Sequence, residues 1–266
     1  MKIVVLVKQV PDTTEMSVDK EKGTLNRQGV PTIINPDDLA GIETALRLRE
    51  TYGGHVHALS MGPSQAESMM QELYSRGVDS CTLLTDKRFA GSDTWATSNI
   101  LAHAIKKIPF DLIIAGRQAI DGDTAQVGPQ VAEFLDIPQA TYVEKVIKVH
   151  DGSIRIQRAF EDESLVQDIK LPCLITTLRD TIEPRYMNAY DIFAVGECST
   201  RVWTYDDLAL EEGTTGLKGS PTKVKKTFVK SLDKDTRIIT PETPEEAAQA
   251  IIEMLFRNGG MLHGRD

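Results

Sequence analysis

The segment DLIIAGRQAIDGDTAQVGP, residues 111–129, carries the strongest indication of fold in this chain. A short apolar run ends at Gly116, a polar loop of small residues follows, and an amphipathic helical pattern extends from Val127 to about Leu135. A strand, a small-residue loop and a helix in this order present backbone N–H groups at a helix N-terminus, where a phosphate can bind. An ordinary strand-to-helix turn is the alternative interpretation. The density of Asp, Thr, Gln and Gly in the loop favours a nucleotide site.

Similar patterns recur along the chain. Apolar runs of strand length lie at residues 2–7, 55–61, 81–85, 111–115 and 171–178. Helical patterns lie between most of them, and the first opens at Asn35-Pro36-Asp37-Asp38, where Asn and Asp side chains are expected to cap the helix. Repeated β-α alternation with short connections predicts an α/β fold, a Rossmann-like open parallel sheet with helices on both faces.

A hairpin and a C-terminal arm are expected to complete the architecture. Alternating runs at 142–150 and 153–160 flank Asp151-Gly152 and predict a β-hairpin with a primed turn. Residues 211–223, rich in Gly, Thr, Ser and Pro, predict a linker, and Thr243-Pro-Glu-Glu246 predicts a helix start. We therefore expect a nucleotide-binding domain at 1–205, and at 206–266 a linker and an arm that docks on a partner.

The expected terminal helix carries an apolar stripe that it cannot bury alone. Its members are Ala247, Ala250, Ile251, Met254 and Leu255. The stripe must therefore dock either on its own domain or on another chain.

The composition excludes several classes of protein. The chain has 266 residues and a formal net charge of −9, which argues against general nucleic-acid binding because that requires a basic surface. No apolar stretch approaches the roughly 20 residues that span a bilayer, so no membrane insertion is expected. The cysteines at 81, 173 and 198 are widely spaced and form no CxxC motif. This usage predicts a reducing, cytoplasmic location.

The sequence contains no recognisable catalytic constellation. His55 and His57 lie on one face of an expected strand, and they are either metal ligands or, the favoured interpretation, partly buried strand residues. Asp121 and Asp123 either bind Mg²⁺ beside a phosphate or, as polar loop residues more often do, hydrogen-bond to neighbouring backbone. We expect neither catalytic residues nor a metal.

The loops that follow the expected strands all lie at one edge of the sheet. Ligands of open parallel sheets bind at this edge, outside the carboxyl ends of the strands. The loops are Val7-Lys8-Gln9, Asn35-Pro36-Asp37-Asp38, Ser60-Met61-Gly62-Pro63 and residues 116–129. No GxGxxG follows the first strand and no GxxxxGK[ST] is present, which disfavours conventional Rossmann and P-loop sites.

Several motifs in register over residues 1–195 resemble the β subunit of electron transfer flavoproteins. They are Val4-Val-Leu-Val-Lys8-Gln-Val10, Asn35-Pro36, Ser60-Met61-Gly62-Pro63, Gly116-Arg117-Gln118-Ala119-Ile120-Asp121, Gln126-Val-Gly128 and Glu183-Pro-Arg-Tyr186. The resemblance implies a heterodimer with an α subunit that carries a redox FAD. It also implies that this chain binds either a second FAD or a structural AMP.

The resemblance implies the following cofactor-binding residues: Leu6, Lys8, Asn35, Asp38, Met61, Gly116, Arg117, Asp121, Gly122, Asp123, Thr124, Ala125, Gln126, Val127, Gly128, Pro129 and Gln130. Asn35, Asp38 and Met61 would surround the adenosine, and Thr124 and Gln126 would add side-chain hydrogen bonds to the phosphates. A recognition loop for acyl-CoA dehydrogenases would comprise Arg185, Tyr186, Ala189, Tyr190, Ile192 and Phe193. Ala189 stands where some relatives have leucine.

The loop DGDTAQVGP and the upstream Gly91-Ser-Asp-Thr-Trp95 resemble the subgroup that performs flavin-based electron bifurcation, which favours FAD over AMP. In that subgroup NADH reduces this flavin, in complex with the α subunit. One electron then passes to ferredoxin or flavodoxin and the other to an acyl-CoA dehydrogenase. Arg117 or Lys8 would stabilise an anionic flavin, or would pair with aspartates of the loop.

Two other classes of function remain open from the sequence. One is a non-redox ATP-binding protein of the universal-stress type, which would bind ATP as a homodimer. The other, weaker alternative is a hydrolase of the adenine-nucleotide type.

Overall fold

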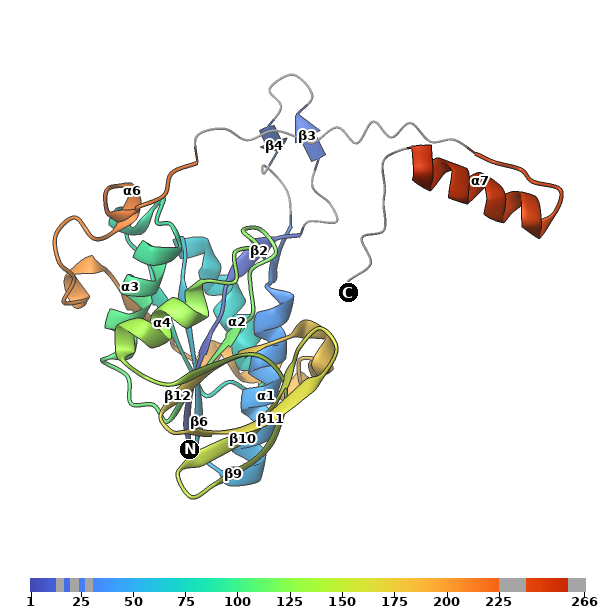
Figure 1. Cartoon of the computed structure of the whole chain (residues 1–266). Helices are drawn as coiled ribbons and strands as arrows, with labels where there is room; N and C mark the ends of the chain where they lie inside the picture. Colours follow the sequence, from blue (N-terminus) through green and yellow to red (C-terminus); the bar gives the residue numbers. More distant parts are fainter. Residues whose placement is uncertain (13–16, 20–23, 27–30, 225–237, 258–266) are drawn as a thin grey trace. The chain divides into compact units, whose positions relative to one another are not determined.

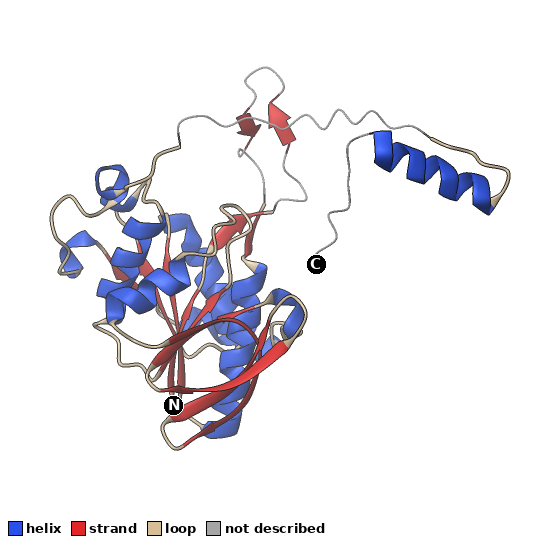
Figure 2. Ribbon diagram, in the orientation of Figure 1, coloured by secondary structure: helices blue, strands red, loops and turns tan. Residues whose placement is uncertain are grey.

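The computed structural model describes residues 1–12, 17–19, 24–26, 31–224 and 238–257 (Figures 1 and 2). The chain forms two compact units, Met1–Thr227 and Phe228–Asp266, and each is described by itself. The boundary expected at residue 205 lies inside the first unit.

The first unit is built on a nine-stranded sheet of order β11-β10-β9-β12-β8-β1-β6-β7-β13. Each pair of neighbours in the series β9-β12-β8-β1-β6-β7-β13 is parallel. The two remaining pairs, β9 with β10 and β10 with β11, are antiparallel. Their bounds are β1 Lys2–Leu6, β6 His55–Met61, β7 Ser80–Leu84, β8 Leu112–Gly116, β9 Gln139–His150, β10 Ser153–Ala159, β11 Ser164–Lys170, β12 Cys173–Thr177 and β13 Arg201–Trp203. The predicted α/β fold is confirmed.

Helices cover both faces of the parallel part of this sheet (Figure 2). The helices α1 (Pro36–Tyr52) and α2 (Glu67–Ser75) pack on one face, while α3 (Thr94–Ile105) and α4 (Val127–Leu135) pack on the other. Because side chains alternate along a strand, β1 sends Ile3 and Val5 to the first face and Val4 to the second. All three side chains are at most 1% exposed, so the strand is buried on both sides, as expected for a parallel sheet.

Short elements complete the first unit. They are β2 (Gln9–Pro11), β3 (Ser17–Asp19), β4 (Thr24–Asn26), β5 (Thr32–Ile34), α5 (Ala189–Ala194), α6 (Gly216–Gly219) and the 3₁₀ turns η1 (Ser64–Ala66), η2 (Lys87–Phe89), η3 (Arg179–Thr181), η4 (Val195–Glu197) and η5 (Tyr205–Asp207). The strand β2 pairs with β5 and β3 pairs with β4, both antiparallel.

The predicted hairpin is present between β9 and β10. Asp151 and Gly152 have φ of 45° and 70°, which is the geometry of a type I′ turn. The third strand of this antiparallel group, β11, was not predicted. Leu165 and Val166 of β11 are 44% and 52% exposed, so the strand lacks the inward alternation by which a strand is recognised.

The segment expected to be a linker at 211–223 packs partly against the start of α3. Asp93 accepts the N–H of Ala96 at 3.0 Å and thereby caps α3. The other carboxylate oxygen of Asp93 accepts hydrogen bonds at 2.8 Å from the backbone and hydroxyl of Thr222. The end of the first unit is therefore attached to the N-terminus of α3.

The second unit contains α7 (Pro244–Arg257), which begins where the sequence predicted a helix. Glu246 N–H donates to the Thr243 hydroxyl at 3.3 Å. Within this unit Ile251 and Ile252 are 53% and 51% exposed, while the side chain of Leu255 lies outside the described residues. Among the described residues, no helix has the length and apolar character needed to cross a bilayer.

Candidate functional site

A cavity of about 350 Å³ lies at the carboxyl ends of β1, β6 and β8. Most of the expected cofactor-binding residues line it: Leu6, Lys8, Asp38, Met61, Gly116, Arg117, Gly122, Asp123, Thr124, Ala125, Gln126, Val127 and Gly128. Asn35, Asp121, Pro129 and Gln130 are not part of the wall. The structure thus brings the loops after three strands together around one cavity.

Sequence reasoning missed the wall that α3 contributes. Thr94, Thr97 and Leu101 line the cavity, and their spacing places them on one face of the helix. The sequence of residues 91–95 resembles the bifurcating subgroup, but this resemblance does not indicate that the segment lines the cavity. The other lining residues that were not expected are Val7, Leu59, Ser92, Asp93, Ala115, Gln118 and Ala119.

Asn35 supports the loop 116–129 from behind the wall. Its side chain was predicted to cap α1, but it makes no cap hydrogen bond. The Asn35 amide nitrogen donates to the Gln118 carbonyl at 2.8 Å, and its amide oxygen accepts the Ile120 N–H at 3.1 Å. The prediction of a cap was wrong because the backbone of a distant loop uses both polar atoms of this side chain.

Two aspartates of the loop are held by protein side chains. The Lys8 ammonium donates to both carboxylate oxygens of Asp121, at 2.7 and 2.9 Å. Asp123 accepts a hydrogen bond from the Gln118 side chain. The sequence favoured neighbouring backbone as the partner of these aspartates, whereas the structure shows both of them held by side chains. Within the described ranges, no group of three or more His, Cys, Asp or Glu could hold a metal.

Asp38 joins the ends of β1 and β8 to the start of α1. Its carboxylate accepts the N–H of Lys8 at 2.8 Å and the N–H of Gly116 at 3.1 Å. Burial raises the pKa of Asp38 to about 7, although these hydrogen bonds favour its ionised form. A Cβ atom on Gly116 would lie 2.1 Å from Asp38 Oδ1, so this close approach requires glycine.

Arg117 places a positive charge at the wall of the cavity. Its Nε lies 3.4 Å from Asp37 Oδ2, and the Asp37 side chain is 4% exposed. Its guanidinium lies 5.9 Å from the centre of the Tyr142 ring, a distance at which a cation is attracted to the ring face. Arg117 therefore pairs with an aspartate of α1, and not with the aspartates of its own loop.

The start of α4 closes one side of the cavity. No side chain caps this helix, and a Cβ on Gly128 would lie 3.0 Å from Thr176, so α4 packs closely on β12. Asp123 and Ala125 both have a φ of 53°, the left-handed conformation found in backbone anion sites. The Gln126 side chain accepts a hydrogen bond from the Thr94 hydroxyl at 2.9 Å and joins this loop to α3.

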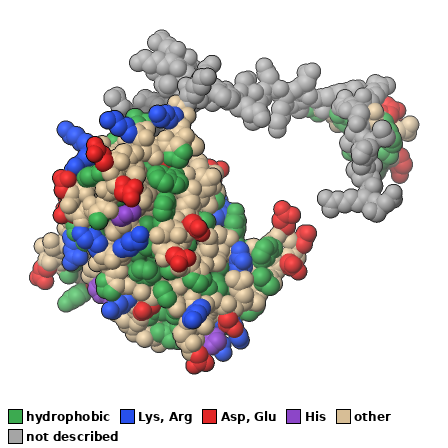
Figure 3. Space-filling model, turned by 60° about the vertical axis from the view of Figure 1, so that its left-hand side comes forward, with side chains coloured by type: hydrophobic (Ala, Val, Ile, Leu, Met, Phe, Trp, Pro, Cys, Tyr) green, Lys and Arg blue, Asp and Glu red, His purple; other side chains and the backbone are tan. Residues whose placement is uncertain are grey.

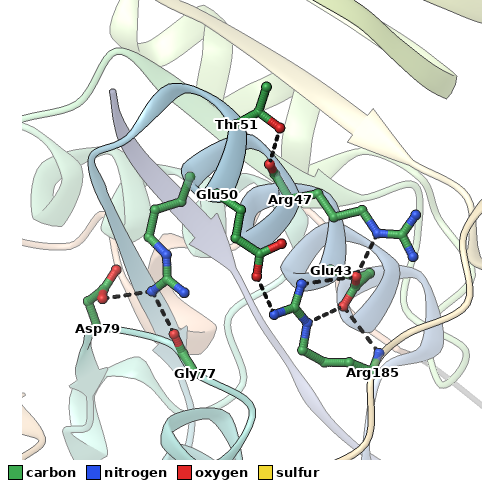
Figure 4. A network of polar contacts seen from close by, with 8 residues as sticks. Glu43, Arg47, Glu50, Thr51, Gly77, Asp79 and Arg185 are labelled. Atoms are coloured by element: carbon green, nitrogen blue, oxygen red, sulfur yellow. Dashed lines mark hydrogen bonds and ion pairs between the residues drawn. The ribbon is translucent and has the colours of Figure 1, made fainter.

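The expected recognition loop begins at an arginine that is anchored by ion pairs to α1 (Figure 4). Arg185 donates to Glu43 at 2.8 Å and to Glu50 at 2.6 Å, and the Glu43 side chain is 4% exposed. Burial of Glu43 opposes its ionisation, yet hydrogen bonds from Arg185 and Arg47 lower its pKa below the ordinary value. Arg76 donates to the Arg185 carbonyl at 2.5 Å, so side chain and backbone of Arg185 are both fixed.

The residues that follow this anchor expose a group of large apolar side chains. Asn188 caps α5 by accepting the N–H of Tyr190 at 2.9 Å, and its own N–H donates to the Ser75 carbonyl. The exposed fractions are 88% for Tyr186, 80% for Tyr190, 46% for Ile192 and 88% for Phe193, and Ala189 is also exposed. Contiguous apolar exposure of this kind is typical of surfaces that bind another protein.

Charges of both signs are interspersed with hydrophobic side chains on the face of the first unit seen in Figure 3. This face therefore does not present the uniformly basic surface that nucleic-acid binding requires. The three cysteines at 81, 173 and 198 are all free.

A mostly parallel sheet covered on both faces, with a cavity at the carboxyl ends of its strands, defines an open α/β protein of the Rossmann-like class. Comparison with known proteins narrows this class. The family model described as the electron transfer flavoprotein domain matches residues 22–199. The chain belongs to the electron transfer flavoprotein family and is of the beta-subunit type.

Three relatives illustrate the similarity. The electron transfer flavoprotein subunit beta of Clostridium acetobutylicum is 48% identical over 96% of this chain and 98% of its own length. Caffeyl-CoA reductase-Etf complex subunit CarD of Acetobacterium woodii is 43% identical over 96% and 98%. Acryloyl-CoA reductase electron transfer subunit gamma of Anaerotignum propionicum is 42% identical over 97% and 98%. These similarities favour electron transfer over the universal-stress and hydrolase alternatives.

Proposed function

We propose that this chain binds FAD in the cavity formed by the loop 116–129, β1 and α3. In complex with an alpha subunit, it would pass electrons from NADH to an acyl-CoA dehydrogenase and to a low-potential acceptor, ferredoxin or flavodoxin. The observation that carries the proposal is the cavity wall itself, where an uncapped helix start, small residues and left-handed backbone face one space. We expect the complex in the cytoplasm.

The residues present fit a nucleotide cofactor. The α4 N-terminus offers backbone N–H groups that no side chain caps, as a pyrophosphate requires. A Cβ on Gly122 would meet nothing within 4 Å, so this part of the loop leaves room for a phosphate to approach the backbone. The cavity volume of about 350 Å³ is in the range of small-molecule sites. Structural AMP would use the same groups, so AMP in a non-bifurcating complex is the alternative.

The protein would position the cofactor and set its electrostatic environment. When bound, FAD supplies the hydride acceptance and one-electron transfer that side chains cannot. Arg117 holds a positive charge at the wall, partly balanced by Asp37 at 3.4 Å. Lys8 is paired with Asp121 at 2.7 Å and contributes little net charge.

We assign the surfaces that contact partner proteins from the exposed apolar side chains. Two relatives that are named for reductases of CoA thioesters support this assignment. The exposed Tyr186, Tyr190, Ile192 and Phe193 would contact the acyl-CoA dehydrogenase. The apolar side of α7 would dock on the alpha subunit, since Ile251 and Ile252 are half exposed within their own unit.

Extraction of the ligands from the co-expressed heterodimer tests the proposal. Two FAD per heterodimer and reduction of flavin by NADH are expected. One FAD and one AMP would refute bifurcation. The variant Thr97→Phe, which fills the cavity from α3, should lower the content to one FAD, whereas Thr51→Phe on the exposed side of α1 should retain two.

A further inference from the structure

A second cavity, of about 580 Å³, lies at the opposite edge of the sheet. It is formed by the amino ends of β1, β6, β7 and β13 and by the segment after α3. Its lining residues used below are Lys2, His55, His57, Ser80, Lys107 and Arg201. The nucleotide cavity at the carboxyl edge shares none of its residues.

The wall of this second cavity is cationic although the chain as a whole carries a net charge of −9. Lys2, Lys107 and Arg201 line it, and none of its lining residues is a carboxylate. In the described part of the chain, neither the Lys2 ammonium nor the Arg201 guanidinium forms an ion pair. Two carboxylates lie nearby without being part of the lining. Asp79 Oδ2 is 3.9 Å from His55 Nδ1 but is also paired with Arg49, and Asp111 Oδ2 accepts the backbone N–H of Lys2 at 2.7 Å. The three lining cations outnumber these two carboxylates, and such an excess of positive charge attracts an anion from solution.

An aromatic ring positions two of these cations. Lys107 Nζ lies 5.5 Å and the Arg201 guanidinium 5.7 Å from the centre of the Trp203 ring. Lys107 also donates to the backbone carbonyl of Asp207. Because the ring and the carbonyl restrict the two long side chains, the charges are held near the cavity before any ligand arrives.

The histidine pair that the sequence left open as a metal site lies in this wall. The Ser80 hydroxyl lies 2.7 Å from His55 Nε2 and 2.7 Å from His57 Nδ1, so one serine joins the two rings. His57 is 8% exposed, and its Nε2 has no hydrogen-bond partner among the described residues. Burial and the nearby charges of His55 and Arg201 lower the pKa of His57 to about 4, which leaves its ring neutral.

We propose that this cavity binds a small phosphate-bearing anion. Lys2 and Arg201 would neutralise the phosphate, and the linked Ser80 and His55 would supply hydrogen bonds. A guanidinium, an ammonium and hydroxyl or imidazole donors together suit a multiply charged tetrahedral group better than a single carboxylate. Ile108 and Pro109 give the wall an apolar part that can contact an organic group attached to the phosphate.

Equilibrium dialysis of the purified heterodimer with labelled orthophosphate and ribose 5-phosphate tests this site. Arg201→Gln and Lys2→Gln should each weaken binding at least tenfold. Lys87→Gln is the matched control, because it removes an exposed cation beyond the carboxyl end of β7 and should leave binding unchanged. The flavin content should be the same in all variants, so the result is independent of the proposed cofactor.

The outcomes separate the sources of the phosphate. If ribose 5-phosphate binds more tightly than orthophosphate, the ligand of this cavity is a phosphate ester. If the two bind equally well, the ligand is free phosphate. Three results would overturn the proposal: no saturable binding to the heterodimer, binding that both variants leave unchanged, or equally tight binding of malonate. Binding to the isolated chain that the alpha subunit abolishes would likewise overturn it and identify this edge as part of the subunit interface.

Discussion

The amide oxygen of Asn35 accepts the backbone N–H of Ile120 at 3.1 Å, across 85 positions of sequence. Asn35 is 0% exposed and also donates to the Gln118 carbonyl at 2.8 Å. The residue before α1 thereby fixes the backbone of the loop 116–129. The shape of the cavity wall depends on a side chain that is not itself part of the wall.

Asn35→Ala should destabilise the first unit by about 2–4 kcal/mol, because the half-buried backbone groups of Gln118 and Ile120 both lose their partner. Urea unfolding of the isolated chain measures this loss. Asn188→Ala is the control, since it removes only an exposed helix cap and should cost about 1 kcal/mol. If both variants lose the same free energy of unfolding, Asn35 does not stabilise the loop 116–129 beyond the effect of an ordinary helix cap.

Gly116→Ala should destabilise the chain by about 1–3 kcal/mol, because the added Cβ would meet Asp38 Oδ1 at 2.1 Å. The same substitution at Gly196, where a Cβ has nothing within 4 Å, should change stability by less than about 0.5 kcal/mol. Thermal unfolding compares the two variants. An unaffected Gly116→Ala protein would mean that β8 and α1 can separate at no cost.

Asp38 should make the free energy of unfolding fall as pH rises from about 4 to about 7. The folded chain keeps the Asp38 proton up to about pH 7, whereas the unfolded chain releases it near the ordinary value of 3.8. The contribution to stability is therefore full below pH 3.8 and lost above pH 7, with a slope of at most about 1.4 kcal/mol per pH unit. Urea unfolding between pH 5 and 7 measures this effect, and the free energy of unfolding of Asp38→Asn should not fall over this range.

His57 should produce the opposite slope. Its pKa is about 4 in the folded chain and 6.5 when unfolded, so the unfolded state binds more protons between these values. The free energy of unfolding then rises with pH over this range. His57→Gln should steepen the fall caused by Asp38, and Asp38→Asn should reveal the rise caused by His57. If the free energy of unfolding depends on pH in the same way in both variants, these pH effects do not arise from Asp38 and His57.

Arg185→Gln should release the start of the exposed segment 186–193. Glu43 would keep only Arg47, and we expect a loss of about 2 kcal/mol, less than for a fully buried pair because the Arg185 side chain is 32% exposed. Electron transfer to the proposed partner, an acyl-CoA dehydrogenase, should show a raised KM with little change in kcat, since the variant affects positioning and not chemistry.

Arg179→Gln provides the control for this charge removal. Arg179 pairs with Asp180 at 3.5 Å, and both side chains are more than half exposed, so the variant should behave as the wild type. If Arg185→Gln leaves KM unchanged, the ion pairs of Arg185 do not contribute to recognition of the partner.

Local patterns were sufficient to predict much of the fold. The helix α4 has the bounds Val127–Leu135 that its amphipathic pattern indicated, and β6 has the predicted bounds His55–Met61. These elements are recognisable because each has a continuous apolar run or stripe and a polar boundary. The turn at Asp151-Gly152 was predictable because few residues adopt positive φ at both positions.

Long-range relationships could not be predicted in this way. Asn35 is a good helix cap by type, but a loop far along the sequence uses its polar atoms instead. The strand β13 has only three residues and was missed, although its Arg201 helps form the cationic cavity. That cavity draws its charges from segments near residues 2, 107 and 201, so no local pattern could indicate it.

The hydrogen bonds between Thr222 and Asp93 connect the stretch around Thr222 to the wall of a cavity. Asp93 lines the cavity proposed to bind the nucleotide and caps α3, and Thr222 is among the last described residues of the first unit. The stretch around Thr222 is thus attached at the rim of this cavity. A substitution at Asp93 would therefore change the cavity wall, the cap of α3 and the anchoring of this stretch at the same time.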